Sequence, residues 1–105
     1  MTSEILFEVD TPLDFLVRVS KSYWQFIVTV KHPTMIDMEA EVQSTLRNPQ
    51  QIRRSRSDAD VYLFYREQFA QRWLCAVARR LNGDGFLITA YPTDAIKVGE
   101  SVWQQ

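Results

Sequence analysis

The sequence predicts an α+β domain in which two helices pack on one face of an antiparallel sheet of about four strands, with an extra N-terminal β-hairpin. Two observations predict this class. Short runs of β-branched and aromatic residues bounded by turn signals occupy both the first 19 residues and the second half of the chain, and they are typical of strands. The segment between them carries apolar residues at three- and four-residue spacing, which is typical of helices. Helices and strands are thus segregated, whereas a βαβ fold would alternate them.

A 105-residue chain has the length of one domain, in which residues 1–19 form the hairpin addition and residues 20–105 the core. Hydrophobic residues make up 46% of the chain and charged residues 24%, as in soluble folded domains. No apolar run reaches the roughly 18 residues of a membrane span, and the first residues lack the basic start of a secretory signal. We therefore expect a cytoplasmic protein without a membrane partner.

The N-terminal hairpin is predicted from residues 5–9 and 15–19, two runs of strand-forming residues separated by the turn signal Asp10-Thr11-Pro12. A first helix follows, capped by Ser20 or Ser22. The residues that recur at helical spacing in this segment are Tyr23, Trp24, Ile27, Val28 and Lys31. Its β-branched residues leave a strand as the competing interpretation.

A second helix is predicted after a break at His32-Pro33. Thr34 is a suitable N-cap, and Asp37 three residues later completes a near capping box. The helix is expected to end near Asn48-Pro49. Its apolar stripe, which needs a sheet face to cover it, consists of Met35, Met38, Val42 and Leu46.

The antiparallel sheet is predicted from the second half of the chain. The expected strands are residues 52–55, 61–66, 73–80 and 85–91. A polar turn over residues 57–60 precedes the second of them. The glycine-containing segment Asn82-Gly83-Asp84-Gly85 lies between the last two and indicates a β-hairpin.

Arginine is concentrated in one stretch of a chain whose formal net charge is −1. Residues 47–80 contain eight arginines against three acidic residues. Guanidinium groups suit planar, bidentate contacts to phosphate. The count leaves two interpretations open, a site for a polyanion and a solvated surface.

The chain lacks the residues that most metals and cofactors require. One cysteine, Cys75, and one histidine, His32, are too few for a Cys/His zinc site, and a single cysteine cannot form an internal disulfide. No glycine-rich nucleotide loop and no zinc-hydrolase motif occurs. We therefore expect no metal and no cofactor, and Cys75 is interpreted as a buried apolar residue.

Several segments of the chain form an ordered pattern. They are His32-Pro33-Thr34-Met35, residues 46–52, Ser55 with Asp58, residues 62–66, residues 85–91, Ile96-Lys97 and Trp103. This pattern resembles the Barnase/EndoU/colicin/RelE-like (BECR) superfamily of metal-independent ribonucleases, in particular its small branch from phages and bacteria. The resemblance implies an RNA-cleaving fold, often a toxin paired with an antitoxin protein. It excludes the first hairpin, and the pI of about 5.8 departs from the basic character of such toxins.

Metal-independent RNA cleavage needs a base for the ribose 2′-hydroxyl, an acid for the 5′-oxygen and donors for the charged phosphorane. His32 is the only residue of the type that titrates near neutrality, and with the resemblance this makes it a catalytic candidate. Thr89 and Tyr91 are further catalytic candidates, because alternation places both on one strand face, together with Leu87. The alternative interpretations are a histidine that only ends a helix and an ordinary half-exposed strand.

Phosphate-binding candidates are the cations and one hydroxyl near the predicted strand ends. Alternation puts Arg54 and Arg56 on one face and Arg53 on the other, so that only one subset can contact the substrate. Ser55 is a candidate donor to a phosphate oxygen, although a structural serine at a strand end is the more common case. Lys97 is expected to reach back toward the same site after a turn.

Arg66 completes the predicted catalytic set. It ends its strand on the face of Tyr62 and Phe64, where a guanidinium would be placed for bidentate contact with a phosphate. A solvated charge at the strand end is the alternative. The aromatic residues that could stack on bases, although most are expected in the core, are Tyr23, Trp24, Phe26, Trp73 and Trp103.

These observations together predict a metal-independent endoribonuclease whose substrate is RNA and whose expected protein partner is an antitoxin. The alternative is a non-catalytic module of the same fold that binds RNA or a protein. The two hypotheses differ in whether RNA is cleaved or only bound.

Overall fold

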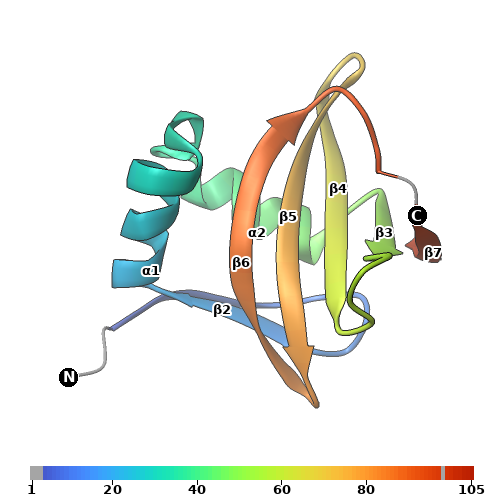
Figure 1. The fold of residues 1–105 in the computed structure, drawn as a ribbon, viewed down its shortest axis with the longest axis horizontal. Helices are drawn as coiled ribbons and strands as arrows, with labels where there is room; N and C mark the ends of the chain where they lie inside the picture. The colour runs from blue at the N-terminus through green and yellow to red at the C-terminus, as the bar shows by residue number, and fades with distance from the viewer. Residues whose placement is uncertain (1–3, 98) are drawn as a thin grey trace.

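The body of the molecule is a seven-stranded mixed sheet (Figure 1), seen in a computed structural model that describes residues 4–97 and 99–105. The strands are β1 (Ile5–Asp10), β2 (Leu16–Ser20), β3 (Gln51–Arg54), β4 (Val61–Phe69), β5 (Arg72–Leu81), β6 (Asp84–Thr93) and β7 (Glu100–Gln104). They lie in the order β1-β2-β6-β5-β4-β3-β7. The predicted four-stranded antiparallel sheet is therefore wrong: the four expected strands correspond to β3–β6, and the sheet continues beyond them on both sides.

The N-terminal hairpin is confirmed, but it is part of the main sheet rather than an addition to it. β1 pairs antiparallel with β2, and β2 then pairs parallel with the start of β6 through Arg18 and Phe86. Phe7, Val9 and Val17 from the hairpin are buried in the main core. Burial of these apolar side chains attaches the hairpin to the rest of the molecule. Alternation within the hairpin predicts its two strands but not the strand with which they pair.

The strand that the sequence did not predict is β7. It pairs antiparallel with β3 and forms one edge of the sheet. The segment is short, begins with Glu100 and contains one aromatic residue, Trp103, that packs against the core. Pairing with β3 therefore stabilises it more than its own weak strand preference.

The first helical segment is confirmed in preference to a strand. α1 (Lys21–Phe26) begins at Ser20, whose side chain accepts the Tyr23 N–H at 3.1 Å. It then widens into a π-helical turn over Ile27–Lys31, where the His32 N–H donates to the Ile27 carbonyl at 2.7 Å. Such turns contain one extra residue and are frequent at functional sites.

The second helix is shorter than predicted. A 3₁₀ turn, Pro33–Met35, follows His32, Asp37 has a positive φ of 64°, and α2 (Glu39–Arg47) begins only after these residues. Thr34 is therefore not the N-cap of this helix. The predicted apolar stripe nevertheless faces the core, since Met35, Val42 and Leu46 are buried and Met38 packs against them.

The sheet has one covered face and one open face, and Figure 1 shows α2 behind the strands. On the covered face Phe64, Ala76 and Ala90 belong to the large core that α1 and α2 close. On the opposite side, here called the open face, a small cluster surrounds Tyr65 and Cys75. Within the described residues, no helix has the length and apolar character needed to cross a membrane.

Candidate functional site

A β-bulge in β6 decides which side chains reach the open face. Val77 of β5 pairs with Thr89, whereas the next residue, Ala78, pairs with Leu87, so that Ile88 is the extra residue. Leu87 accordingly points into the main core with 1% exposure, although the sequence places it with Thr89 and Tyr91. That grouping is wrong because the bulge breaks the alternation. Bulges often lie next to active sites, where they re-aim a side chain.

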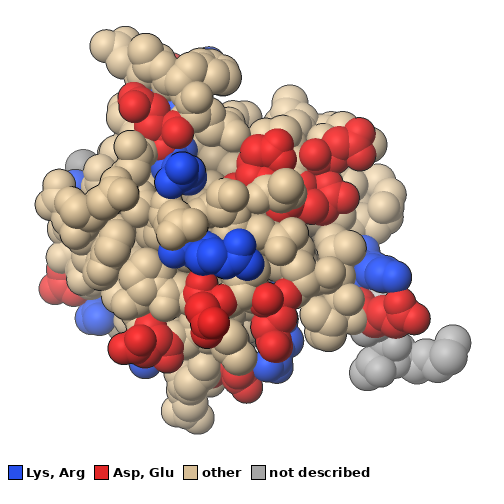
Figure 2. Space-filling view, turned by 180° about the vertical axis from the view of Figure 1, so that it is seen from behind, with Lys and Arg blue, Asp and Glu red and all other residues tan. Residues whose placement is uncertain are grey.

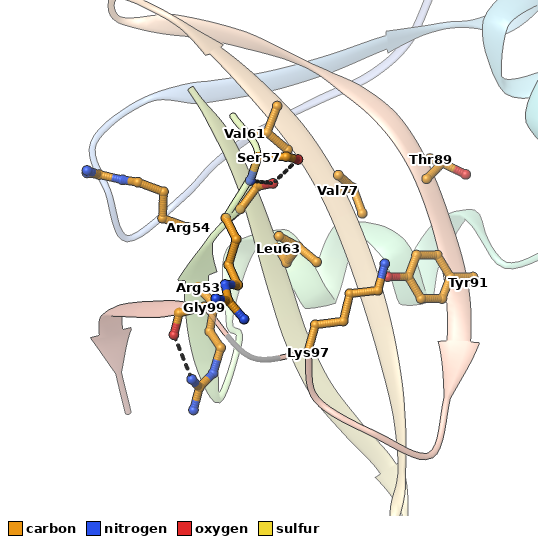
Figure 3. A pocket seen from close by; sticks show the side chains of 12 residues that line it. Arg53, Arg54, Ser57, Val61, Leu63, Val77, Thr89, Tyr91, Lys97 and Gly99 are labelled. Carbon is orange, nitrogen blue, oxygen red and sulfur yellow. Dashed lines mark hydrogen bonds between the residues drawn. The ribbon is translucent and has the colours of Figure 1, made fainter. Parts of the chain in front are cut away.

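The open face contains a hollow of about 390 Å³, which we call the cationic pocket. Figure 3 shows it between the end of β3, the segment before β7, and β6. Its lining residues are Arg53, Arg54, Ser55, Arg56, Ser57, Val61, Leu63, Val77, Thr89, Tyr91, Lys97 and Gly99. Seven of these are among the nine residues that the sequence singled out, so the fold brings most of that set together.

Three positive charges of the pocket lack a counter-charge. Arg53, Arg56 and Lys97 form no ion pair with any carboxylate in the described part of the chain. The Arg53 guanidinium donates to the Gly99 carbonyl at 3.0 Å and to the Gln51 side chain at 2.9 Å. These bonds hold Arg53 in place and leave donors for a ligand, and uncompensated cations in a hollow attract an anion.

Tyr91 lines the pocket from β6 and has an unsatisfied hydroxyl. Its Oη is shielded from solvent and has no hydrogen-bond partner among the residues that the structure describes. The Lys97 ammonium lies 5.6 Å from the centre of the Tyr91 ring, and Figure 3 shows the two side chains pointing toward one another. A buried donor without a partner costs free energy, so an incoming acceptor is favoured at this position.

Thr89 carries a second unsatisfied hydroxyl, since its shielded Oγ1 also lacks a partner within residues 4–97 and 99–105. In Figure 3 this hydroxyl points toward the outer edge of β6, away from Arg53. A change of rotamer would turn it toward the pocket without breaking any hydrogen bond. Thr89 is therefore a candidate ligand contact, while the hydroxyl of Tyr91 already faces Lys97.

His32 reaches this site from the end of the π-helical turn. Its ring lies 5.3 Å from the ring of Tyr91, measured between centroids, at an interplanar angle of 36°. His32 is partly exposed and is not itself a lining residue of the pocket. The imidazole of His32 and the ammonium of Lys97 thus both lie beside the Tyr91 ring.

Beneath the pocket, the Cys75 thiol and the Tyr65 hydroxyl are buried. Burial is the main cause that raises the pKa of Cys75 to about 11, and the neighbouring Tyr91 and Tyr65 hydroxyls partly oppose this effect. Burial is also the main cause that raises the pKa of both tyrosines well above the ordinary value of 10.0. Tyr91 is therefore a neutral hydrogen-bond donor at physiological pH rather than a base. Cys75 is buried, as expected from the sequence.

Tyr65 also positions Lys97, a role that the sequence did not reveal. Its Oη accepts the backbone N–H of Lys97 at 3.1 Å and so fixes the segment that precedes β7. Gly99 lies in the same segment, where a Cβ would stand 2.6 Å from the Arg54 carbonyl oxygen. The only sequence signal for these roles is alternation, which places Tyr65 on the face opposite Phe64.

Arg66 lies outside the site, contrary to the prediction. Its face of β4 was assigned correctly with Tyr62 and Phe64, but this is the covered face. The guanidinium donates to the Asn48 carbonyl at 2.6 Å, at the end of α2. Sequence alternation identifies which residues share a face but not which face is open.

Alternation cannot relate Arg56 to Arg54, because β3 ends at Arg54. Arg53, Arg54 and Arg56 all contribute to the lining of the pocket, but Figure 3 shows the Arg54 side chain pointing away from Lys97. The Arg54 guanidinium instead lies 5.5 Å from the centre of the Tyr62 ring and pairs with Glu100 at 3.5 Å. Arg54 therefore helps to hold the sheet edge.

Ser55 begins the turn that carries Arg56. Its hydroxyl lies 3.2 Å from that of Ser57 and accepts the Ser57 N–H at 3.3 Å, so its observed contacts are structural. Asp58 ties this turn to the sheet by pairing with Arg79. A hydrogen bond from the Asp60 backbone and the contact with Arg79 lower the pKa of Asp58, which is therefore ionised at neutral pH.

The side of the molecule opposite the pocket carries both acidic and basic side chains (Figure 2). Figure 2 views the molecule from the side of α2, and acidic side chains form several patches there. Acidic residues, 13 against 12 basic ones, determine the net charge, but they are not distributed evenly. The net charge of −1 therefore does not describe the local charge of the cationic pocket.

Comparisons of the chain with protein-family models, with curated proteins and with solved structures find no match. Within the described residues, no group of three His, Cys, Asp or Glu side chains could hold a metal ion. The chemistry of the cationic pocket is therefore the basis for a functional proposal.

Proposed function

We propose that the protein is a metal-independent endoribonuclease whose active site is the cationic pocket. The observation that carries the proposal is the shielded, unpartnered hydroxyl of Tyr91, flanked by the His32 ring and by the unpaired cation of Lys97. A neutral donor and cations gathered in one hollow suit a phosphodiester that gains negative charge during the reaction. The resemblance to the BECR superfamily supports the same reaction class.

Each chemical step has a candidate group in or beside the pocket. In our proposal the imidazole of His32 accepts the proton of the ribose 2′-hydroxyl, and the 2′-oxygen attacks phosphorus. Tyr91 and the Arg53 guanidinium donate hydrogen bonds to the phosphorane oxygens. The bond to the 5′-oxygen then breaks, Lys97 supplies the proton to that oxygen, and the products carry a 2′,3′-cyclic phosphate and a 5′-hydroxyl.

The unpaired cations of the cationic pocket reconcile an RNA substrate with an acidic protein. Phosphate binding depends on the local field of Arg53, Arg56 and Lys97 rather than on the net charge of −1. We propose a cytoplasmic site of action, where RNA is available. An antitoxin, if the protein is a toxin, would have to cover the open face to block this pocket.

Cleavage of single-stranded RNA by the purified protein in EDTA tests the proposal. We expect cleavage by the unaltered chain and a rate about 10²–10⁴-fold lower in His32→Ala, the usual contribution of a general acid–base group. Arg72→Ala is the matched control for surface charge, because Arg72 is exposed and lies outside the pocket. Its rate should equal that of the unaltered chain.

Three results would count against the proposal. Absence of products, with or without ribosomes, would exclude the nuclease. RNA binding without cleavage would instead identify a non-catalytic module of the same fold. Equal rates for the unaltered chain and His32→Ala would remove His32 from the mechanism.

A further inference from the structure

A second hollow, with a volume of about 320 Å³, lies between α1, the hairpin of β1 and β2, and the start of β6. Its lining residues are Ile5, Arg18, Val19, Ser20, Tyr23, Phe86 and Leu87. Two large apolar side chains remain exposed there, since Ile5 is 51% and Phe86 39% accessible to solvent. We call it the aromatic hollow. Adjacent exposed apolar side chains at a concave site are a common feature of ligand-binding surfaces.

The aromatic hollow and the cationic pocket share strand β6 and the bulge within it. The Tyr23 hydroxyl, on the wall of the hollow, donates to the carbonyl of the bulge residue Ile88 at 2.8 Å. The next residue, Thr89, lines the cationic pocket. Phe86 and Thr89 are three residues apart, which is about 10 Å at the usual rise of a strand. One ligand strand lying along β6 can therefore occupy both sites.

A cation lies beside the Tyr23 ring, which lines the hollow, and beside the neighbouring ring of Phe26. The Lys31 ammonium lies 5.7 Å from the centre of the Tyr23 ring and 5.8 Å from that of Phe26, and it donates to the Ile88 carbonyl at 3.3 Å. No carboxylate in the described ranges pairs with it. By contrast, the nearby Arg18 is neutralised by Glu8 and Asp84.

We propose that the aromatic hollow is a second nucleotide subsite, which stacks a base flanking the cleaved phosphodiester while Lys31 contacts its phosphate. This inference rests on the proposed function, because it makes the preferred substrate a single strand of several nucleotides. Aromatic faces beside a cationic track are the usual means of holding single-stranded RNA, and a base in a duplex could not reach Phe86. An apolar peptide would make no use of the unpaired Lys31.

The test compares the binding of two probes at the same salt concentration. Adenosine 3′-monophosphate fills only the cationic pocket, whereas a hexanucleotide of 2′-fluoroadenylate spans both sites and lacks the attacking hydroxyl. We expect Phe86→Ala to weaken hexanucleotide binding about tenfold, the usual effect of losing one stacked base, without changing monophosphate binding. Lys31→Ala should also reduce the salt dependence of hexanucleotide binding by about 0.7 in log–log slope.

Phe69→Ala is the matched control, because Phe69 is also an exposed phenylalanine, at 65%, but lies outside both hollows. It should bind both probes like the unaltered chain. Unchanged hexanucleotide affinity in Phe86→Ala would overturn the second subsite, and so would an equal loss for both probes.

Cleavage of unmodified RNA by the unaltered chain, measured in parallel, separates this inference from the proposed function. If the unaltered chain cleaves RNA but Phe86→Ala does not selectively weaken hexanucleotide binding, the subsite alone is overturned. If Phe86→Ala weakens hexanucleotide binding but not monophosphate binding, and the unaltered chain cleaves no RNA, the subsite is supported and the nuclease is overturned. Failure of the unaltered chain to bind either probe overturns both.

Discussion

Tyr91 combines a cost in stability with a role in the proposed reaction. Its shielded hydroxyl has no partner among the described residues, and a buried unsatisfied donor costs about 1–3 kcal/mol. We therefore expect Tyr91→Phe to leave the free energy of unfolding unchanged or to raise it by about 1 kcal/mol. Cleavage should fall about 10²–10³-fold, as when one donor to a developing oxyanion is removed. Urea unfolding and cleavage rates measure the two effects, and a destabilised variant with full activity would contradict both assignments.

Cys75 makes the stability of the protein sensitive to alkaline pH. Its pKa rises from 9.0 to about 11 in the folded protein, so folding favours the protonated thiol. The resulting stabilisation is complete below about pH 9 and is lost as the pH rises toward 11. The raised pKa values of Tyr65 and Tyr91 act in the same direction at still higher pH.

Denaturant unfolding between pH 7 and 11 measures this dependence. We expect the unaltered chain to lose stability above pH 9, and Cys75→Ala to show a smaller loss over the same interval. Superimposable changes in stability for the two proteins would show that the thiol is not the responsible group.

At the scale of elements, the close approach of the segment before β7 to β3 shapes the cationic pocket. A Cβ at Gly99 would lie 2.6 Å from the Arg54 carbonyl oxygen, so Gly99→Ala must push the two segments apart and weaken the Arg53–Gly99 hydrogen bond. We expect a loss of about 1–3 kcal/mol in stability and weaker RNA binding. Gly83→Ala is the control, because nothing lies within 4 Å of a Cβ there. Calorimetry that finds both variants equally stable would contradict this account of the pocket wall.

The limits of prediction from the sequence also lie at this scale. Composition and spacing suffice for the N-terminal hairpin, the first helical segment and strands β3–β6, because these depend on local preference. The bulge at Ile88 does not follow from local preference, and it moved Leu87 away from Thr89. Tertiary packing likewise decides that β2 joins β6 and that the face bearing Arg66 is covered. The sequence identified most of the pocket residues through their chemical types, and it did not predict correctly which sheet face each of them occupies.

At the scale of the whole molecule, the electrostatic contribution to RNA binding has an expected size. If Arg53, Arg56 and Lys97 each contact a phosphate, log affinity for single-stranded RNA should fall with log salt at a slope of about −2. A fourth contact at Lys31 would bring the slope to about −3. Lys97→Ala should reduce its magnitude by about 0.7, while Arg72→Ala should leave it unchanged. A flat dependence for the unaltered chain would show that the cationic pocket does not bind phosphate.

The chemical identity of the RNA ends is the most direct test of the central claim, that the cationic pocket cleaves RNA through attack by the 2′-hydroxyl. A short RNA is incubated with the protein in EDTA, and the ends of the fragments are identified by mass spectrometry. We predict a 2′,3′-cyclic phosphate on one fragment and a 5′-hydroxyl on the other, with no cleavage where the attacking ribose is replaced by deoxyribose. Fragments with 3′-hydroxyl and 5′-phosphate ends, or cleavage that persists at the deoxyribose, would contradict the mechanism.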